Sequence, residues 1–177
     1  MSTGELLTRS TIWISILSYV LGAIAFALRK QTVNIDAITR VAWTIGIGAL
    51  VAHFATAFHF YHHWSQLDAY RETARQTNEV FGLNWGGGLF INYGLLALWI
   101  ADVGWWWARG LESYRLRPLP IVLLWHGFVV FILFNALVVF KDGWQRWAGV
   151  VICIILCWAW IRTGIRTATK HYGFTKS

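Results

Sequence analysis

Charged residues, prolines and cysteines are all scarce in this chain. Of its 177 residues only 13% are Asp, Glu, Lys or Arg, whereas 57% are hydrophobic and the mean hydropathy is +0.51. Soluble domains carry about a quarter charged residues, so this composition excludes an ordinary water-exposed surface. The two prolines and the lack of a Gly- or Ser-rich linker give no sign of a second domain. We therefore expect a single membrane domain over residues 1–177.

The positions of the cysteines and of the basic residues argue against a disulfide-stabilised protein and against a nucleic-acid-binding protein. Cys153 and Cys157 are the only cysteines, and both fall inside one apolar run, so a disulfide framework is not indicated. The formal net charge is +7, but Lys and Arg fall between the apolar runs and after the last one. This pattern differs from the basic stripe of a nucleic-acid-binding surface. The expected partner is the lipid bilayer.

Five apolar stretches are long enough, or nearly so, to cross a bilayer. A helix needs roughly 20 apolar residues for this. The predicted spans cover residues 11–28, 38–63, 85–107, 119–140 and 147–161. The chain also has 13 tryptophans, which concentrate where a bilayer meets water. The sequence therefore predicts an all-α, polytopic integral membrane helix bundle with about five transmembrane helices.

The basic residues predict the orientation of these spans. One side, formed by the N-terminus and the second and fourth connections, carries Arg9, Arg71, Arg75, Lys141 and Arg146. The other side carries Arg29, Lys30, Arg40, Arg109, Arg115, Arg117, Arg162, Arg166, Lys170 and Lys176. The richer side is cytoplasmic by the positive-inside rule, so we expect a cell (inner) membrane protein with its N-terminus outside and its C-terminus inside. Residues 25–27 resemble a signal cleavage site, but cleavage there would place the basic side outside, so we expect the first span to stay as a membrane anchor.

Residues 65–84 form the one substantial segment on the predicted outer side. Ser65 and Asp68 resemble a helix N-cap pair, and Gly82 is a typical C-terminal residue. Apolar residues recur between them at helical spacing against charged ones. This pattern predicts a short amphipathic helix along the outer membrane face.

The second predicted span ends in a cluster of histidines. His53, His59, His62 and His63 are four of the six histidines in the chain. On a helix His59 and His63 share a face, so both can reach one Fe, Cu or Zn ion, or one histidine can hold a b-type haem. The carboxylates Asp68 and Glu72 follow closely and are possible supporting ligands. The alternative is that the histidines are interfacial and bind only water, headgroups and backbone.

The segment His59-Phe-Tyr-His62-His63 resembles one histidine box of the membrane-bound fatty-acid desaturase and hydroxylase family. Such boxes assemble a two-iron site in that family, and they need more histidines than the six that this chain contains. The resemblance covers one box, and we do not extend the family's activity to this chain.

Two further sets of polar residues are expected at similar depths in the bilayer. His53, Asn92 and Asn135 fall at one level in the outer half, and Asp102, His126 and the two cysteines fall nearer the cytoplasmic side. The asparagines are alternatively hydrogen-bond partners between helices, and Asp102 alternatively pairs with Arg109 at the interface. The cysteines are alternatively small apolar fillers of the helix bundle.

These residues favour a redox or electron-transfer subunit with a metal or haem site on the second span. A haem between two helices needs ligands at similar depth, and His53 and His126 differ by about 10 Å, which leaves a single ligand or a dimer interface. The first alternative is a non-catalytic structural or assembly subunit with a membrane-protein partner or a second copy. The second is a proton- or ion-coupled carrier, although the chain has no internal repeat. No catalytic group is defined, so enzyme activity stays open.

Overall fold

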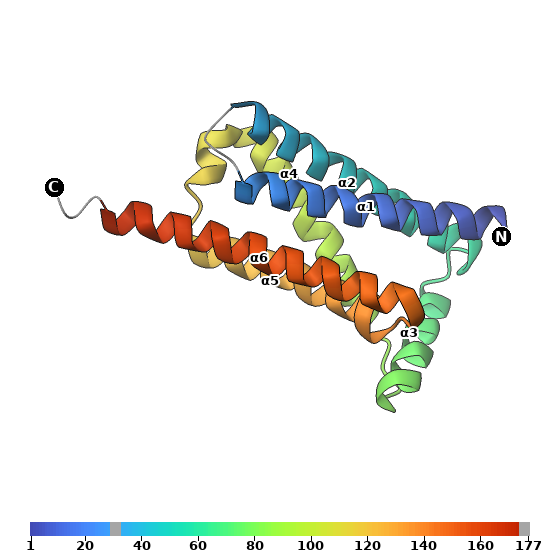
Figure 1. Ribbon diagram of the computed structural model, residues 1–177. Coiled ribbons are helices and arrows are strands. Elements are labelled where there is room, and N and C mark those ends of the chain that lie inside the picture. The colour runs from blue at the N-terminus through green and yellow to red at the C-terminus, as the bar shows by residue number, and fades with distance from the viewer. Residues whose placement is uncertain (29–32, 174–177) are drawn as a thin grey trace. The chain divides into compact units, whose positions relative to one another are not determined.

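The structure, a computed structural model, describes residues 1–28 and 33–173, without the side chains of 33–35, 111–112, 115 and 163–173. All regular secondary structure in the described residues is helical, with no strand (Figure 1). Its elements are α1 (Thr3–Leu28), α2 (Val33–Phe60), α3 (Gln66–Phe81), α4 (Gly88–Arg115), α5 (Leu119–Phe134), the π-helical segment η1 (Asn135–Val139) and α6 (Gly143–Gly173).

Within the described residues, five helices are long and apolar enough to cross a membrane. They are Thr3–Leu28, Asp36–Phe60, Gly88–Gly110, Leu119–Val139 and Gly143–Arg162. This confirms the predicted all-α fold with about five spans. The boundaries differ at the first two spans, since α1 already begins at Thr3 and α2 ends at Phe60.

The chain divides into two compact units. The first unit comprises Met1–Tyr19 and Ala42–Gly104, and the second comprises Val20–Val41 and Trp105–Ser177. The boundary crosses α1, α2 and α4, so each of these helices contributes to both units.

In the first unit α1 and α2 run antiparallel in contact. Near the boundary the Trp43 indole Nε1 donates a hydrogen bond to the Tyr19 carbonyl oxygen at 3.2 Å, and the two rings stack with centroids 6.0 Å apart. Trp99 of α4 meets Tyr19 edge-on at 5.4 Å. A Cβ at Gly46 would lie 2.9 Å from the Trp99 ring, so a glycine is needed for this close approach of α4.

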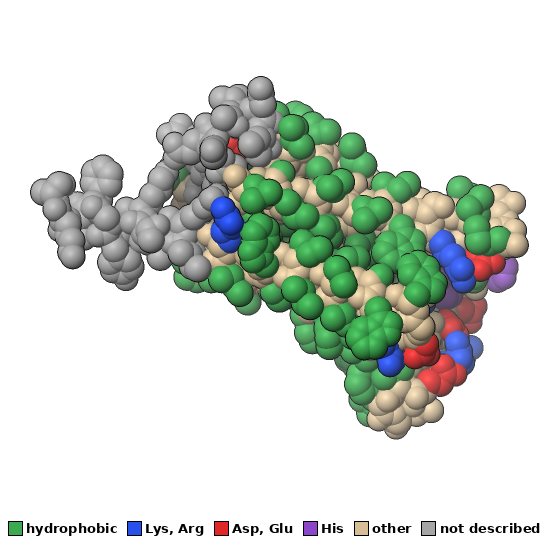
Figure 2. Space-filling model, in the orientation of Figure 1, with side chains coloured by type: hydrophobic (Ala, Val, Ile, Leu, Met, Phe, Trp, Pro, Cys, Tyr) green, Lys and Arg blue, Asp and Glu red, His purple; other side chains and the backbone are tan. Residues whose placement is uncertain are grey.

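Helix α3 has the caps that its sequence predicts. The Ser65 side chain accepts a hydrogen bond from the Asp68 backbone N–H at 3.2 Å. Gly82 ends the helix in the left-handed region at φ 68°, and its N–H donates to the Asn78 carbonyl. Ala69, Ala74 and Thr77 are buried, whereas acidic and basic side chains lie next to one another on the exposed face of α3 (Figure 2). The amphipathic helix within 65–84 is thereby confirmed.

In the second unit α5 and α6 lie side by side and antiparallel (Figure 1). A Cβ added to Gly149 of α6 would lie 2.6 Å from the Leu137 Cβ and 2.9 Å from the Leu137 carbonyl oxygen. The backbone of α6 therefore packs directly against η1. The Arg146 Nε–H donates to the carbonyls of Val138, within η1, and Lys141, just after it, at 3.0 and 2.9 Å.

Aromatic side chains join the other helix ends of the second unit. Phe26 of α1 meets Tyr114 of α4 edge-on at 6.4 Å and Trp160 of α6 at 5.8 Å. Trp106 stacks on Tyr114 with centroids 4.2 Å apart. All four side chains are buried, so this cluster is the core of the second unit.

Candidate functional site

His53 is held by α1 through a hydrogen bond across the α1–α2 contact. Its Nδ1 lies 3.0 Å from the Thr8 carbonyl oxygen. Because a carbonyl only accepts, Nδ1 carries the proton, and in the neutral imidazole Nε2 then keeps its lone pair. The Phe54 ring meets the imidazole edge-on at 6.2 Å. His53 is thus an oriented, half-buried imidazole in the apolar part of α2.

The predicted pairing of His59 with His63 on one helix face is wrong. Helix α2 ends at Phe60, and His63 and Trp64 follow with positive φ values of 47° and 61°. The chain turns there, with the Ser65 N–H donating to the His62 carbonyl at 2.7 Å. The spacing of four residues places side chains together only while the helix continues, so it does not apply here.

The same turn brings His62 to the start of α3. A groove at this corner is lined by Tyr61, His62, Asp68, Arg71, Glu72, Arg75 and Gln76. His62 and the two predicted supporting carboxylates therefore share one groove. His59 and His63 are exposed beside it, and neither lines it.

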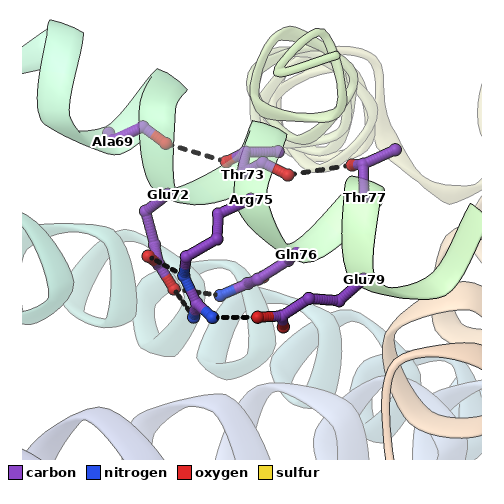
Figure 3. A network of polar contacts seen from close by, with 7 residues as sticks. All are labelled: Ala69, Glu72, Thr73, Arg75, Gln76, Thr77 and Glu79. Atoms are coloured by element: carbon purple, nitrogen blue, oxygen red, sulfur yellow. Dashed lines mark hydrogen bonds and ion pairs between the residues drawn. The ribbon is translucent and has the colours of Figure 1, made fainter. Parts of the chain in front are cut away.

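Both carboxylates of this corner groove are bound by arginines. Glu72 accepts two hydrogen bonds from Arg75, at 2.8 and 2.6 Å, and one from Gln76 at 2.8 Å (Figure 3). Arg75 also pairs with Glu79, and Arg71 lies 3.9 Å from Asp68. The Arg75 guanidinium holds the pKa of Glu72 at about 2, and in turn Glu72 raises the pKa of Arg75. A metal ion at Glu72 would have to displace this arginine.

No group of three or more His, Cys, Asp or Glu side chains in the described part of the chain is arranged to hold a metal ion. At the corner groove there are two reasons: α2 ends before His63, and arginines already bind Asp68 and Glu72. His53 is separate from that groove because it lies two turns earlier on α2 and contacts α1.

The predicted polar layers each draw residues from both units. Asn92 is exposed and Asp102 half-buried on the first-unit part of α4. Asn135 and His126 belong to the second unit, where the Asn135 amide donates to the Phe131 carbonyl at 2.8 Å within its own helix. Both layers therefore stay predictions.

His126 has the most enclosed position of the predicted residues. Its side chain is 1% exposed and stacks on Trp160 of α6, with ring centroids 3.4 Å apart and planes within 11°. Cys153 is buried and Cys157 exposed on the same helix. This stacking joins α5 to α6 next to the aromatic core of the second unit.

Two features of the structure were not predicted from the sequence: a pair of buried polar residues and a π-helical segment. Asp36 and Thr39, in the first turns of α2, are 1% and 0% exposed. Asp36 stands four residues before Arg40 at the edge of an apolar run, and a carboxylate in that position is the signal that could have identified it. The π segment at Asn135 is the second feature, and its sequence differs little from that of an ordinary α-helix.

Comparison with protein-family models, curated proteins and solved structures finds no match to this chain. Support for a function therefore comes from the geometry of the chain's own residues.

Proposed function

We propose that this protein is a multi-pass subunit of a membrane redox assembly in which His53 would bind the iron of a b-type haem. The supporting observation is the hydrogen bond from His53 Nδ1 to the Thr8 carbonyl. Histidines that bind metals or haem iron typically donate one ring N–H to a carbonyl or carboxylate, which fixes the ring and leaves the other nitrogen for the metal. His59 and His63, by contrast, are exposed at the end of α2 and in the turn that follows it.

One ligand from this chain is sufficient for the proposal. Any further ligand would come from a partner or a second copy. His126 belongs to the other compact unit, and the proposal does not depend on it.

The test is the visible absorption spectrum of protein purified in mild detergent from haem-replete cells. We expect a Soret band and reduced α and β bands that are lost in His53→Ala and kept in His59→Ala, an exposed histidine of the same helix. A colourless wild-type preparation would overturn the haem proposal and favour a structural or assembly subunit. A spectrum that survives His53→Ala would assign the haem to another ligand.

A second candidate is a non-haem transition-metal site at the corner groove. It is favoured by the placement of His62, Asp68 and Glu72 along one groove, with nitrogen and oxygen donors suited to Fe, Cu or Zn. Metal binding there must compete with Arg75. We therefore expect Arg75→Gln to raise the affinity for Zn²⁺ in titration calorimetry and His62→Ala to lower it, whereas His53→Ala leaves it unchanged.

The orientation with the N-terminus outside and the C-terminus in the cytoplasm belongs to the same proposal, as does location in the cell membrane. It is supported by the excess of Lys and Arg on one set of helix connections. The test uses single cysteines in a background without Cys153 and Cys157. An impermeant maleimide applied to intact cells should label Gln76→Cys on α3 and not Leu116→Cys, a position that is 76% exposed between α4 and α5.

A further inference from the structure

The arginines whose side chains the structure describes contact two kinds of group. One group forms ion pairs with carboxylates: Arg9 with Glu5 at 2.9 Å, Arg71 with Asp68 at 3.9 Å, Arg75 with Glu72 at 2.6 Å and Arg146 with Asp142 at 3.0 Å. The other group lies over aromatic rings: Arg40 over Trp107 at 4.0 Å, Arg109 over Trp105 at 5.5 Å, Arg117 over Tyr114 at 3.5 Å and Arg162 over Trp158 at 5.4 Å. The two groups coincide with the two sides that the sequence predicts.

The four ring-bound arginines all belong to the second unit. Arg40 lies near the start of α2, Arg109 near the end of α4, Arg117 in the α4–α5 connection and Arg162 at the end of the apolar part of α6. The contact of Arg40 with Trp107 and those of Phe26 with Tyr114 and Trp160 bring these helix ends together. We call the four arginines and their rings the basic end.

A carboxylate and an aromatic ring act differently on the charge of an arginine. A carboxylate cancels the charge of its arginine, whereas an aromatic ring attracts the guanidinium and leaves its charge in place. The ring covers one face of the guanidinium and holds its plane, while the N–H groups at the edge can still donate. Among the side chains that the structure describes, no carboxylate forms an ion pair with Arg109 or Arg162.

We propose that Arg109 and Arg162 of the basic end bind the phosphate groups of anionic phospholipids in the adjacent leaflet. A planar guanidinium suits bidentate hydrogen bonding to phosphate oxygens. The ring partners Trp105, Trp107 and Trp158 are 47%, 53% and 45% exposed, and exposed tryptophans prefer the headgroup region of a bilayer. Free phosphate offers the same oxygens, but it gains nothing from these exposed rings, so the surface fits a lipid.

The experiment measures lipid selectivity by electron spin resonance in phosphatidylcholine vesicles that contain the full-length protein. Spin-labelled phosphatidylglycerol is compared with spin-labelled phosphatidylcholine, and the fraction of immobilised label gives the relative association constant. We expect phosphatidylglycerol to be favoured about fivefold or more, with the preference falling as salt is added. It should fall to near one in Arg109→Gln/Arg162→Gln.

Two matched variants separate this surface from general charge effects. Arg71→Gln/Arg75→Gln removes the same number of arginines from the carboxylate-paired group and should leave the preference unchanged. Arg109→Lys/Arg162→Lys keeps the charge without the bidentate geometry and should give an intermediate value, which also covers the case in which the glutamine variant fails to fold.

Three outcomes would overturn the proposal. One is a wild-type preference near one, and another is an equal loss in the Arg71 and Arg75 variant. The third is competition by inorganic phosphate beyond that of chloride at matched ionic strength, which would show a site for soluble phosphate.

Discussion

The Nδ1 atom of His53 lies 3.0 Å from the carbonyl oxygen of Thr8, across the contact between α1 and α2. The Thr11 hydroxyl lies 3.1 Å from that oxygen, but its shorter hydrogen bond, at 2.7 Å, goes to the Leu7 carbonyl. The histidine therefore anchors α1 to α2 whether or not Nε2 binds a cofactor. Measurements on cofactor-free protein can therefore separate the contribution of His53 to stability from its role as a ligand.

Replacing His53 by Ala should lower the free energy of unfolding by about 1 kcal/mol in cofactor-free protein, the typical net contribution of one hydrogen bond. His59→Ala on the same helix is exposed and should change it by less than about 0.5 kcal/mol. Equilibrium unfolding in detergent micelles measures both. Equal effects of the two substitutions would contradict the assigned contact.

The stability of α3 should depend on pH through the ionisation of Glu72. Its pKa is lowered from the ordinary value of 4.5 to about 2, chiefly by hydrogen bonds from Arg75. A lowered pKa in the folded state means that the ionised form is stabilising, so the contribution is fully present above pH 4.5 and is lost as the pH falls towards 2. Because the side chain is 38% exposed, we expect only about 0.5–1 kcal/mol.

Hydrogen exchange of the α3 amides measures this contribution. Protection should decrease between pH 4.5 and pH 2 in the wild type. In Glu72→Gln it should already be lower at neutral pH and change little over that interval. Glu79→Gln is the control, because Glu72 keeps both hydrogen bonds from Arg75. A wild-type profile that is flat with pH would contradict the pair.

Much of the fold was predictable because membrane helices have a strong local signal. A run of about 20 apolar residues is sufficient for a span, and Ser65 and Gly82 define the ends of α3 by local hydrogen bonds and backbone geometry. These features depend on neighbouring residues alone. The same holds for the division of Lys and Arg between the helix connections.

The site was less predictable because it depends on where a helix stops and on contacts between distant residues. Nothing local marks Phe60 as the last residue of α2, so the spacing of His59 and His63 predicts a pair on a helix that does not reach His63. The Thr8–His53 contact joins residues 45 positions apart and does not follow from periodicity. Glu72 and Arg75 are spaced for an ion pair on a helix, but this spacing alone does not decide whether an arginine or a metal ion binds the carboxylate.

The left-handed backbone conformation of His63, in the turn after α2, can be tested by substitution with glycine. His63 has a φ of 47°, a conformation that costs a residue with a side chain about 1 kcal/mol relative to glycine. His63→Gly should therefore raise the free energy of unfolding by up to about 1 kcal/mol. His62 has no positive φ, so His62→Gly should lower it. Urea titration in micelles compares the two, and a loss of stability in His63→Gly would assign the imidazole a packing contact that outweighs the strain.

The contact between α6 and η1 should tolerate no side chain at Gly149. A Cβ there would lie 2.6 Å from the Leu137 Cβ and 2.9 Å from the Leu137 carbonyl oxygen, and the backbone oxygen cannot move without disturbing the π segment. We expect Gly149→Ala to lower the free energy of unfolding by about 1–3 kcal/mol, as overpacking does elsewhere. Gly127→Ala of α5 is the matched control, since a Cβ at Gly127 meets nothing within 4 Å. This substitution should be neutral or slightly stabilising, because alanine has the higher helix propensity. Thermal unfolding in micelles distinguishes the two variants, and an unchanged midpoint in Gly149→Ala would contradict the direct packing of α6 on η1.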